Sequence, residues 1–524
     1  MSIIFSDLLK GELIFFFINI NFFIFIFIFT FSKLYYSKLL NINYNSTVTL
    51  NYKLSYKRFT DNSKNIIKYI LRFLLQVYIF FFFNFSYYFS YTNNSYLYNF
   101  CINNFNWYYC LIIVFLTIVS FFFFLKLINN NMIKSIENIL GLHFFFLSIY
   151  FLLFFNNIIS VIFLFELQSL IFIYILASSY NHDNTVRQSR WYFNSLMYQF
   201  WVSFISALLL IYGFLSIYRF SSFVEWNNIE LFFYFINYSW YSIFHIKVFM
   251  VWLPILLGFI LKLGFFPFFL WKPEIYKNLS TITLFIYMSS YLFSLLVFLI
   301  NFFYNYFYLL FNLWYFFFYI LISISFIFIS FSLYSITEVR QFLAYTSIIH
   351  ICFILISIFN FKTINLSITY FYLFTYLFFI FFFFIIIFSL SNNFLWFLTD
   401  FQYLTKVPLI VTSLSILMLG MAGIPPFLGF FAKLSIISSL LLNEDYFLFF
   451  LSIFIGLFVS FFYIQNYRFY GFNLKNIYYV KSTIVYKFVE KFFIWLYIFI
   501  FINLFSIFFI NDFFILTSLL VIFI

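Results

Sequence analysis

The chain has 524 residues, of which 66% are hydrophobic and only 8% are charged. A soluble domain carries about 25% charged residues, so this composition excludes the soluble classes and favours a protein embedded in a membrane. The formal net charge of +12 suits basic loops beside a membrane, and no soluble basic domain exists that would bind nucleic acid.

Apolar runs recur along the whole chain, and a helix needs about 20 such residues to cross a bilayer. We therefore predict an all-α polytopic membrane protein with about fourteen transmembrane helices. The first apolar run is too long for the core of a signal peptide, so we expect it to be a mature helix. The apolar stretches at 229–244 and 511–524 are expected to add or extend helices. The predicted helices lie near 13–32, 67–90, 108–128, 139–156, 158–179, 193–218, 247–266, 281–302, 307–334, 341–359, 366–390, 407–440, 446–467 and 488–510.

Basic residues gather in loops that follow odd-numbered helices, above all in the segment 33–67. The loop after the second helix (91–106) has no charge, and the loop after the twelfth carries Glu444 and Asp445. Basic loops stay on the cytoplasmic or matrix side of a membrane, so the N-terminus is predicted on the opposite side.

All six prolines and five of the ten glycines lie in two windows, 254–273 and 408–433. Proline removes a backbone donor and clashes with the preceding turn, so each window predicts a broken helix. Paired broken helices in the two halves of a chain are typical of transporters built from inverted repeats, and they mark the ion site. Lys262 lies in the first window and Lys433 in the second. The alternative is that the prolines only kink helices and the lysines extend to the membrane surface.

Glu166, Lys262, His350 and Lys433 lie within apolar helices. A charge at the bilayer centre costs about 2.5–3.5 kcal/mol, so these residues are expected to face a partner or a water-filled cavity. We expect Glu166 to pair with Lys262, since a closed pair keeps the lysine protonated and an open pair lets it release the proton. His350 is expected to relay a proton near neutral pH, and Lys433 to be the terminal group. The alternative for His350 is a hydrogen-bonded packing residue.

Other polar residues have weaker patterns. His143 is interpreted as structural, and Arg190 either extends a positive charge into a channel or belongs to a basic loop. Glu338 and Arg340 are expected at a helix entrance, paired or solvated. The three cysteines form no CxxC motif, so neither an iron–sulfur cluster nor a zinc site is predicted.

Four stretches, in this order, resemble one family: FELQSLIFIYILA (165–177), LKLGFFPFFLWKPEIY (261–276), VRQFLAYTSIIH (339–350) and MAGIPPFLGFFAK (421–433). They resemble the antiporter-like chain 2 of the proton-translocating NADH:ubiquinone oxidoreductase, called subunit N in bacteria. The run from Trp271 to Tyr276 and the Glu-Leu-Gln-Ser run favour chain 2 over its paralogues, chains 4 and 5.

The resemblance implies two inverted repeats, a Glu166–Lys262 pair, a relay at His350 and a terminal lysine at Lys433. It also implies that this subunit holds no redox cofactor and works with lipids and the other membrane-arm subunits of respiratory complex I, including neighbouring antiporter-like subunits. The abundance of Phe and Tyr is typical of an AT-rich organellar genome. The predicted location is therefore the mitochondrial inner membrane, with the N-terminus on the intermembrane-space side.

The predicted division places N-terminal helices and the basic loop in 1–138 and a first antiporter-like half in 139–302. A second half follows in 303–467, and C-terminal helices occupy 468–524. The basic segment 33–67 is longer than expected and is predicted to contact a lineage-specific partner subunit.

One feature departs from the family. Members carry a central lysine on the eighth helix, whereas this chain has no charged residue from Asn278 to Thr337. Ser289, Ser290 and Tyr291 stand in that neighbourhood, and hydroxyl groups do not store a proton as a lysine does. Two alternatives to a proton-translocating subunit therefore stay open: an assembly subunit with an impaired channel, and a stand-alone cation/proton antiporter.

Overall fold

The structure is a computed structural model that describes residues 71–79, 95–97, 100–102, 104–127, 133–154, 157–178, 186–226, 228–229, 231–232, 242–302, 311–358, 363–389, 398, 408–471 and 493–522. The predicted first helix and the basic segment 33–67 lie outside the described residues. The chain divides into two compact units, Met1–Tyr192 and Phe193–Ile524. The predicted division at 138, 302 and 467 follows repeats rather than compactness, and it stays a prediction.

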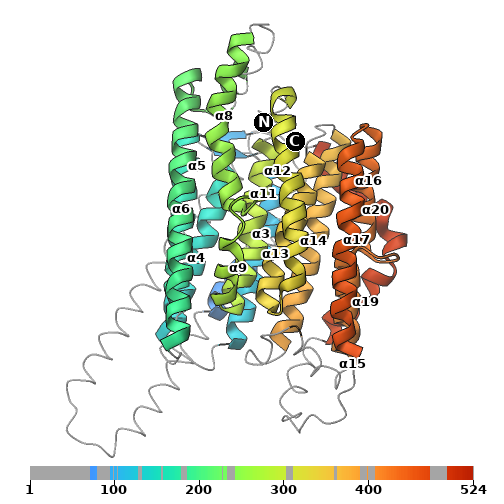
Figure 1. Cartoon of the computed structure of the whole chain (residues 1–524). Helices are drawn as coiled ribbons and strands as arrows, with labels where there is room; N and C mark the ends of the chain where they lie inside the picture. The colour runs from blue at the N-terminus through green and yellow to red at the C-terminus, as the bar shows by residue number, and fades with distance from the viewer. Residues whose placement is uncertain are drawn as a thin grey trace, which may run out of the picture. The chain divides into compact units, whose positions relative to one another are not determined.

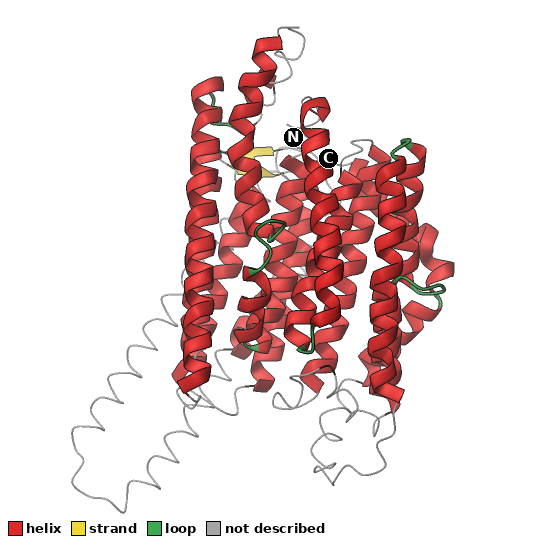
Figure 2. Ribbon diagram, in the orientation of Figure 1, coloured by secondary structure: helices red, strands yellow, loops and turns green. Residues whose placement is uncertain are grey.

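The described part of the first unit contains three long apolar helices, α3 (Asn104–Leu127), α4 (Ile133–Phe154) and α5 (Ile158–Ser178). Helix α4 packs against both α3 and α5. A short antiparallel ribbon of β1 (Ser95–Leu97) and β2 (Phe100–Ile102), which the sequence did not predict, is drawn in yellow in Figure 2. The described residues are otherwise helical, which confirms the all-α class apart from this ribbon.

The second unit is a bundle of helices that run alongside one another, as Figure 1 shows. Its elements are α6 (Val186–Ser221, which begins just before the boundary), α8 (Ser242–Leu263), α9 (Trp271–Asn278), α10 (Thr281–Ile286), the π-helical turn η2 (Tyr287–Tyr291), α11 (Leu292–Phe302), α12 (Phe311–Ser332), the 3₁₀ turn η5 (Leu333–Ser335), α13 (Val339–Ile358), α14 (Thr363–Ser389), α15 (Pro408–Ala422), α16 (Leu428–Leu442), α17 (Tyr446–Gly471), α19 (Phe493–Leu504) and α20 (Ser506–Ile522).

Helices α13 and α14 form the core of this second unit. Helix α13 packs against α9, α12, α14 and α16, and most of its side chains are buried. Helices α6 and α17 instead expose large apolar side chains such as Tyr212, Phe450 and Leu457. A helix satisfies its own backbone hydrogen bonds, so an apolar exposed face of this kind is suited to lipid.

Six of the described helices are long and apolar enough to cross a membrane, and several shorter apolar helices accompany them. A polytopic membrane protein is therefore confirmed, and the full number of about fourteen crossings stays a prediction.

The C-terminal helix prediction needs a correction. Residues 488–510 were predicted as one helix, but the chain forms α19 and α20 on either side of Phe505. The hydroxyl of Ser506 donates a hydrogen bond to the carbonyl oxygen of Pro426 at 2.8 Å, so this second helix starts against the α15–α16 break. The prediction that residues after 510 extend a helix is confirmed, since α20 continues to Ile522.

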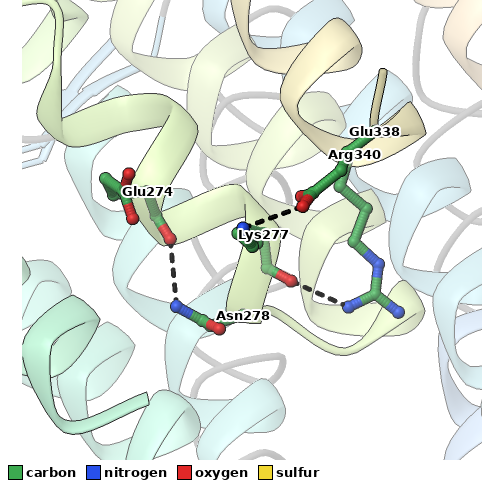
Figure 3. Close-up of polar contacts among 5 residues, drawn as sticks. All are labelled: Glu274, Lys277, Asn278, Glu338 and Arg340. Atoms are coloured by element: carbon green, nitrogen blue, oxygen red, sulfur yellow. Dashed lines mark hydrogen bonds and ion pairs between the residues drawn. The ribbon is translucent and has the colours of Figure 1, made fainter. Parts of the chain in front are cut away.

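The end of α9 is anchored to the start of α13, as Figure 3 shows. Lys277 forms an ion pair with Glu338 at 2.8 Å. The guanidinium of Arg340 donates to the carbonyl oxygens of Lys277 at 3.1 Å and Leu279 at 2.8 Å. A cation at the last carbonyls of a helix satisfies acceptors that have no partner within the helix. Glu338 and Arg340 are thus paired at a helix entrance, as predicted.

Helices α15 and α16 meet at two glycines that leave no room for a side chain. A Cβ atom on Gly429 would overlap the carbonyl oxygen of Gly420 and would lie 3.2 Å from the ring of Phe379. Because the first obstacle is backbone, no side-chain rotation relieves it.

We expect Gly429→Ala to lower the thermal unfolding midpoint of the purified protein in its native assembly, because overpacking costs about 1–3 kcal/mol. The matched control is Gly456→Ala on α17, where an added Cβ would meet nothing within 4 Å. There alanine should leave the midpoint unchanged or raise it, by the better helix propensity of alanine. Equal midpoints for the two variants would contradict the close approach at Gly429.

Candidate functional site

The first predicted broken helix is confirmed, and Gly264 makes the break. Gly264 has φ +75°, and its amide and that of Phe265 bond back to the carbonyl oxygen of Ile260. A glycine in the left-handed conformation ends a helix in this way, since it has no Cβ to clash. Pro267 then prevents the helix from resuming at once, and the chain restarts as α9.

The second predicted broken helix is also confirmed, and it has the same local geometry. Gly423 has φ +79°, and its amide and that of Ile424 both bond to the carbonyl oxygen of Leu419. The chain turns through Pro425 and Pro426 and restarts as α16. The two breaks, far apart in sequence, therefore expose the carbonyl end of a half helix in the same manner.

Lys433 lies on α16 and points back at the end of α15. Its ammonium donates to the carbonyl oxygens of Met421 at 2.9 Å and Ala422 at 2.8 Å. It is 7% exposed, and its ammonium lies 5.6 Å from the ring centre of Phe353. The alternative that Lys433 extends to the membrane surface is therefore wrong. Helix dipoles place partial negative charge at this end, so the position favours a cation.

Lys272, a residue that the sequence analysis missed, has the equivalent position at the first break. It lies on α9, is 1% exposed, and donates to the carbonyl oxygen of Leu263, the last residue of α8, at 3.3 Å. The available signal was its place a few residues after Gly264 and Pro267, between Trp271 and Tyr276. From that position the side chain extends back to the carbonyl end of α8, just as the side chain of Lys433 extends back to the carbonyl end of α15.

Lys262 is buried on the last turn of α8, two residues before Gly264. Burial excludes the alternative that this lysine reaches the membrane surface. Glu166 is partly buried on α5, and its backbone carbonyl accepts a hydrogen bond from Ser169. Glu166 belongs to the first unit and Lys262 to the second. Their pairing stays a prediction.

His350 lies on α13 and is 5% exposed. Its Nδ1 shares a hydrogen bond with the hydroxyl of Tyr372 at 2.8 Å, and its ring centre lies 4.8 Å from that of Tyr376. Its Nε2 has no hydrogen-bond partner among the described residues. One nitrogen of the ring is therefore held by the protein and the other is open to exchange a proton.

His350 and Lys433 line the same small cavity, together with Thr375 and Tyr376 of α14. The cavity has room for about one water molecule, and its lining carries several polar groups that suit one. The structure thus brings two of the four predicted site residues together.

The eighth-helix neighbourhood is a π-helical turn, η2, at Tyr287–Tyr291. The hydroxyls of Ser289 and Ser290 donate to the carbonyl oxygens of Phe285 at 2.7 Å and Ile286 at 2.8 Å. These serines therefore use their donors within their own helix, as serine commonly does inside apolar helices. They therefore have no hydroxyl proton directed along the eighth helix for a proton relay.

His143 was predicted to be structural, and no observation here tests that role. It is fully buried in the first unit, and its Nδ1 shares a hydrogen bond with the hydroxyl of Tyr78 at 2.9 Å. His350 shares a hydrogen bond of the same kind with Tyr372, so a structural role for His143 stays a prediction. The side chain of Arg190 lies outside the described residues.

The site as described is a set of buried amines and one imidazole beside broken helices. Such groups can take up and release protons, and the free carbonyls stabilise their charged form. No group of three His, Cys, Asp or Glu side chains that could hold a metal occurs in the described part of the chain. The absence of a redox cofactor stays a prediction.

Residues 155–459 match the family described as "NADH:quinone oxidoreductase/Mrp antiporter, TM". This chain belongs to that family. The match includes both broken helices and the four predicted site residues.

Relatives in this family are about a quarter identical to the chain over the residues that align. NADH-quinone oxidoreductase subunit N of Wolbachia sp. subsp. Brugia malayi is 27% identical over 286 residues, which are 54% of this chain and 59% of the relative. NADH-ubiquinone oxidoreductase chain 2 of Marchantia polymorpha is 25% identical over 338 residues, which are 64% of this chain and 67% of the relative. The chain therefore matches the Wolbachia relative over less than two thirds of its length.

Solved structures share the fold at lower identity. A chain of respiratory complex I from Thermus thermophilus is 14% identical, with a TM-score of 0.58 over 82% of this chain and 90% of that one. A chain of the Mrp complex from Dietzia sp. is 14% identical, with a TM-score of 0.62 over 78% of this chain and 75% of that one. This antiporter-like fold is thus common to respiratory and antiporter complexes.

We expect Gly423→Ala to displace the amine of Lys433 from the α15 carbonyls. A Cβ atom there would lie 2.7 Å from Cδ and 3.1 Å from Nζ of Lys433, and φ +79° disfavours alanine by about 1–2 kcal/mol. Labelling with a small amine reagent, followed by mass spectrometry, should show Lys433 becoming more reactive than in the parent protein.

The control for this labelling experiment is Gly456→Ala, which adds the same methyl group in open space. It should leave the reactivity of Lys433 unchanged. If Lys433 stayed equally protected in Gly423→Ala, the proposed dependence of the lysine on this glycine would be wrong.

Proposed function

We propose that this chain is an antiporter-like subunit in the membrane arm of an NADH:quinone oxidoreductase, and that it translocates protons in step with quinone reduction. The observation that carries the proposal is the placement of buried lysines at both helix breaks, with His350 beside Lys433 in one cavity. Holding charge inside an apolar bundle costs several kcal/mol, so such residues persist where they serve ion transfer.

The proposed route uses Glu166, Lys262, His350 and Lys433. Glu166 closes on Lys262 and holds its proton, and opening of the pair lets the proton move on. His350 receives a proton at Nε2 and passes it across the shared cavity to Lys433. Lys433 then exchanges with the bulk phase. The carbonyl oxygens of Met421 and Ala422 stabilise the charged lysine between transfers.

The enzyme activity belongs to the complex, since NADH oxidation and quinone reduction take place in other subunits. The proposed partners are the remaining membrane-arm subunits, including neighbouring antiporter-like ones, and lipid along faces such as that of α17. The Phe-rich and Tyr-rich composition and the likeness to chain 2 of Marchantia favour the mitochondrial inner membrane. The basic loops favour an N-terminus on the intermembrane-space side.

Two other functions have a specific observation in their favour. An assembly subunit with an impaired channel is favoured by the uncharged run from Asn278 to Thr337. A stand-alone cation/proton antiporter is favoured by the description of the family, which includes the Mrp antiporter. Native electrophoresis of solubilised membranes distinguishes a stand-alone antiporter from a subunit of a complex. Co-migration of the chain with a large NADH-oxidising complex excludes a stand-alone protein.

We expect Glu166→Gln, Lys262→Met and Lys433→Met each to lower proton translocation and quinone-coupled NADH oxidation about tenfold or more, because each removes a group that carries a proton. Proton uptake into sealed vesicles and the quinone-dependent rate are the measurements. Both should be normalised to the amount of assembled complex on native gels.

The matched controls replace charged residues outside the route. Glu444→Gln changes an exposed carboxylate, and Lys277→Met removes a partly exposed lysine paired with Glu338. An exposed ion pair contributes about 0–1 kcal/mol, so both controls should pump normally. Normal pumping in all three route variants would sink the proposal of translocation by this chain.

A further inference from the structure

Lys272 is a buried cation that the proposed route does not use. It lies within the second unit, on α9, and is 1% exposed. Of the three N–H donors on its ammonium, one is taken up by the carbonyl oxygen of Leu263 at 3.3 Å in the described part of the chain. Its ammonium also lies 5.9 Å from the ring centre of Tyr276, one turn along α9.

The simplest explanation for Lys272 is a structural one, in which it only caps the end of α8. Lys433, by comparison, makes two shorter bonds to the end of α15. A single bond at 3.3 Å is a weaker cap than these two. Capping of α8 therefore accounts for only one of the three N–H donors on this deeply buried ammonium. Buried donors normally have partners, so capping is an incomplete explanation for Lys272.

A series of hydroxyl groups leads from Lys272 toward Lys433. The side chain of Ser347 on α13 lies beside the hydroxyls of both Tyr276 on α9 and Tyr376 on α14. Ser347 donates its own proton to the carbonyl oxygen of Ala344 at 2.6 Å, so toward the two tyrosines it acts as an acceptor. Tyr376 in turn packs on the ring of His350 and lines the cavity that His350 shares with Lys433.

Three buried polar atoms along this series have no well-formed hydrogen bond among the described residues. The hydroxyls of Tyr276 and Tyr376 and Nε2 of His350 have no hydrogen bond of good geometry among the described residues. Three such atoms on adjoining helices are groups whose hydrogen bonds a bridging water would complete. The series runs through α9, α13 and α14 and does not include the eighth-helix turn η2.

We propose that Lys272 is the central proton carrier of this subunit, in the role that relatives give to a lysine on the eighth helix. This inference rests on the proposed function. A proton leaves the ammonium of Lys272, and the hydroxyls of Tyr276 and Tyr376 and the waters that bridge them each take up one proton and pass one on, while Ser347 only accepts hydrogen bonds from the two tyrosines. Nε2 of His350 receives the last proton, so Tyr276 and Tyr376 end unchanged. Lys272 is recharged from Lys262, which lies on the preceding half helix.

The test uses two substitutions that separate proton transfer from charge. Lys272→Met removes the amine, and Lys272→Arg keeps a cation that caps Leu263 but stays protonated at all accessible pH values. In assembled complex, both variants should lose about tenfold or more of the proton flux into vesicles, as expected when a proton-transfer group is removed. The control is Lys277→Met, which removes the partly exposed lysine on the same short helix.

Each outcome decides the inference. Reduced flux in Lys272→Arg, at a normal amount of complex, supports a proton carrier. Full flux in Lys272→Arg overturns it and leaves Lys272 as a structural cation, whatever Lys272→Met does to assembly. Lys433→Met, measured with Glu166→Gln and Lys262→Met, distinguishes the two proposals, because normal flux in all three variants defeats the proposed function itself. Reduced flux in Lys433→Met with normal flux in Lys272→Met defeats only the role of Lys272.

Discussion

The contact between a buried lysine ammonium and the carbonyl end of a broken helix is the interaction on which this protein depends. A helix end inside an apolar bundle has carbonyl groups without partners and a partial negative charge. Lys433 satisfies two such carbonyls at the end of α15, and Lys272 satisfies one at the end of α8. The carbonyl groups at each break stabilise the positive charge of a lysine, and the ammonium of that lysine in turn satisfies carbonyl groups at the break.

Close packing around α13 and α14 keeps these contacts away from lipid. Gly420 and Gly429 let α15 and α16 approach each other against the ring of Phe379. The hydroxyl of Tyr372 on α14 fixes one nitrogen of His350 on α13. Large aromatic side chains fill the remaining space, so a Phe-rich chain still builds a defined polar centre.

The likeness to distant structures at 13–14% identity has a physical basis. Faces toward lipid accept almost any apolar side chain, so Phe replaces other residues there without loss of fold. The breaks do not have this freedom, because Gly264 and Gly423 adopt φ values near +75° and +79° that other residues rarely adopt. The features of this chain that stay recognisable are therefore the breaks in its helices and the few charged residues beside those breaks.

The sequence by itself determined the membrane class, the positions of most described helices, and both breaks, because apolar length and clustered Gly and Pro act locally. It also singled out Lys262, His350 and Lys433 as charges inside apolar runs. Only the tertiary structure revealed Lys272, which stands beside Pro273 in the sequence and whose side chain folds back over Gly264. The cavity between His350 and Lys433 and the series through Ser347 likewise join α9, α13, α14 and α16, and spacing along one chain does not specify such contacts between helices.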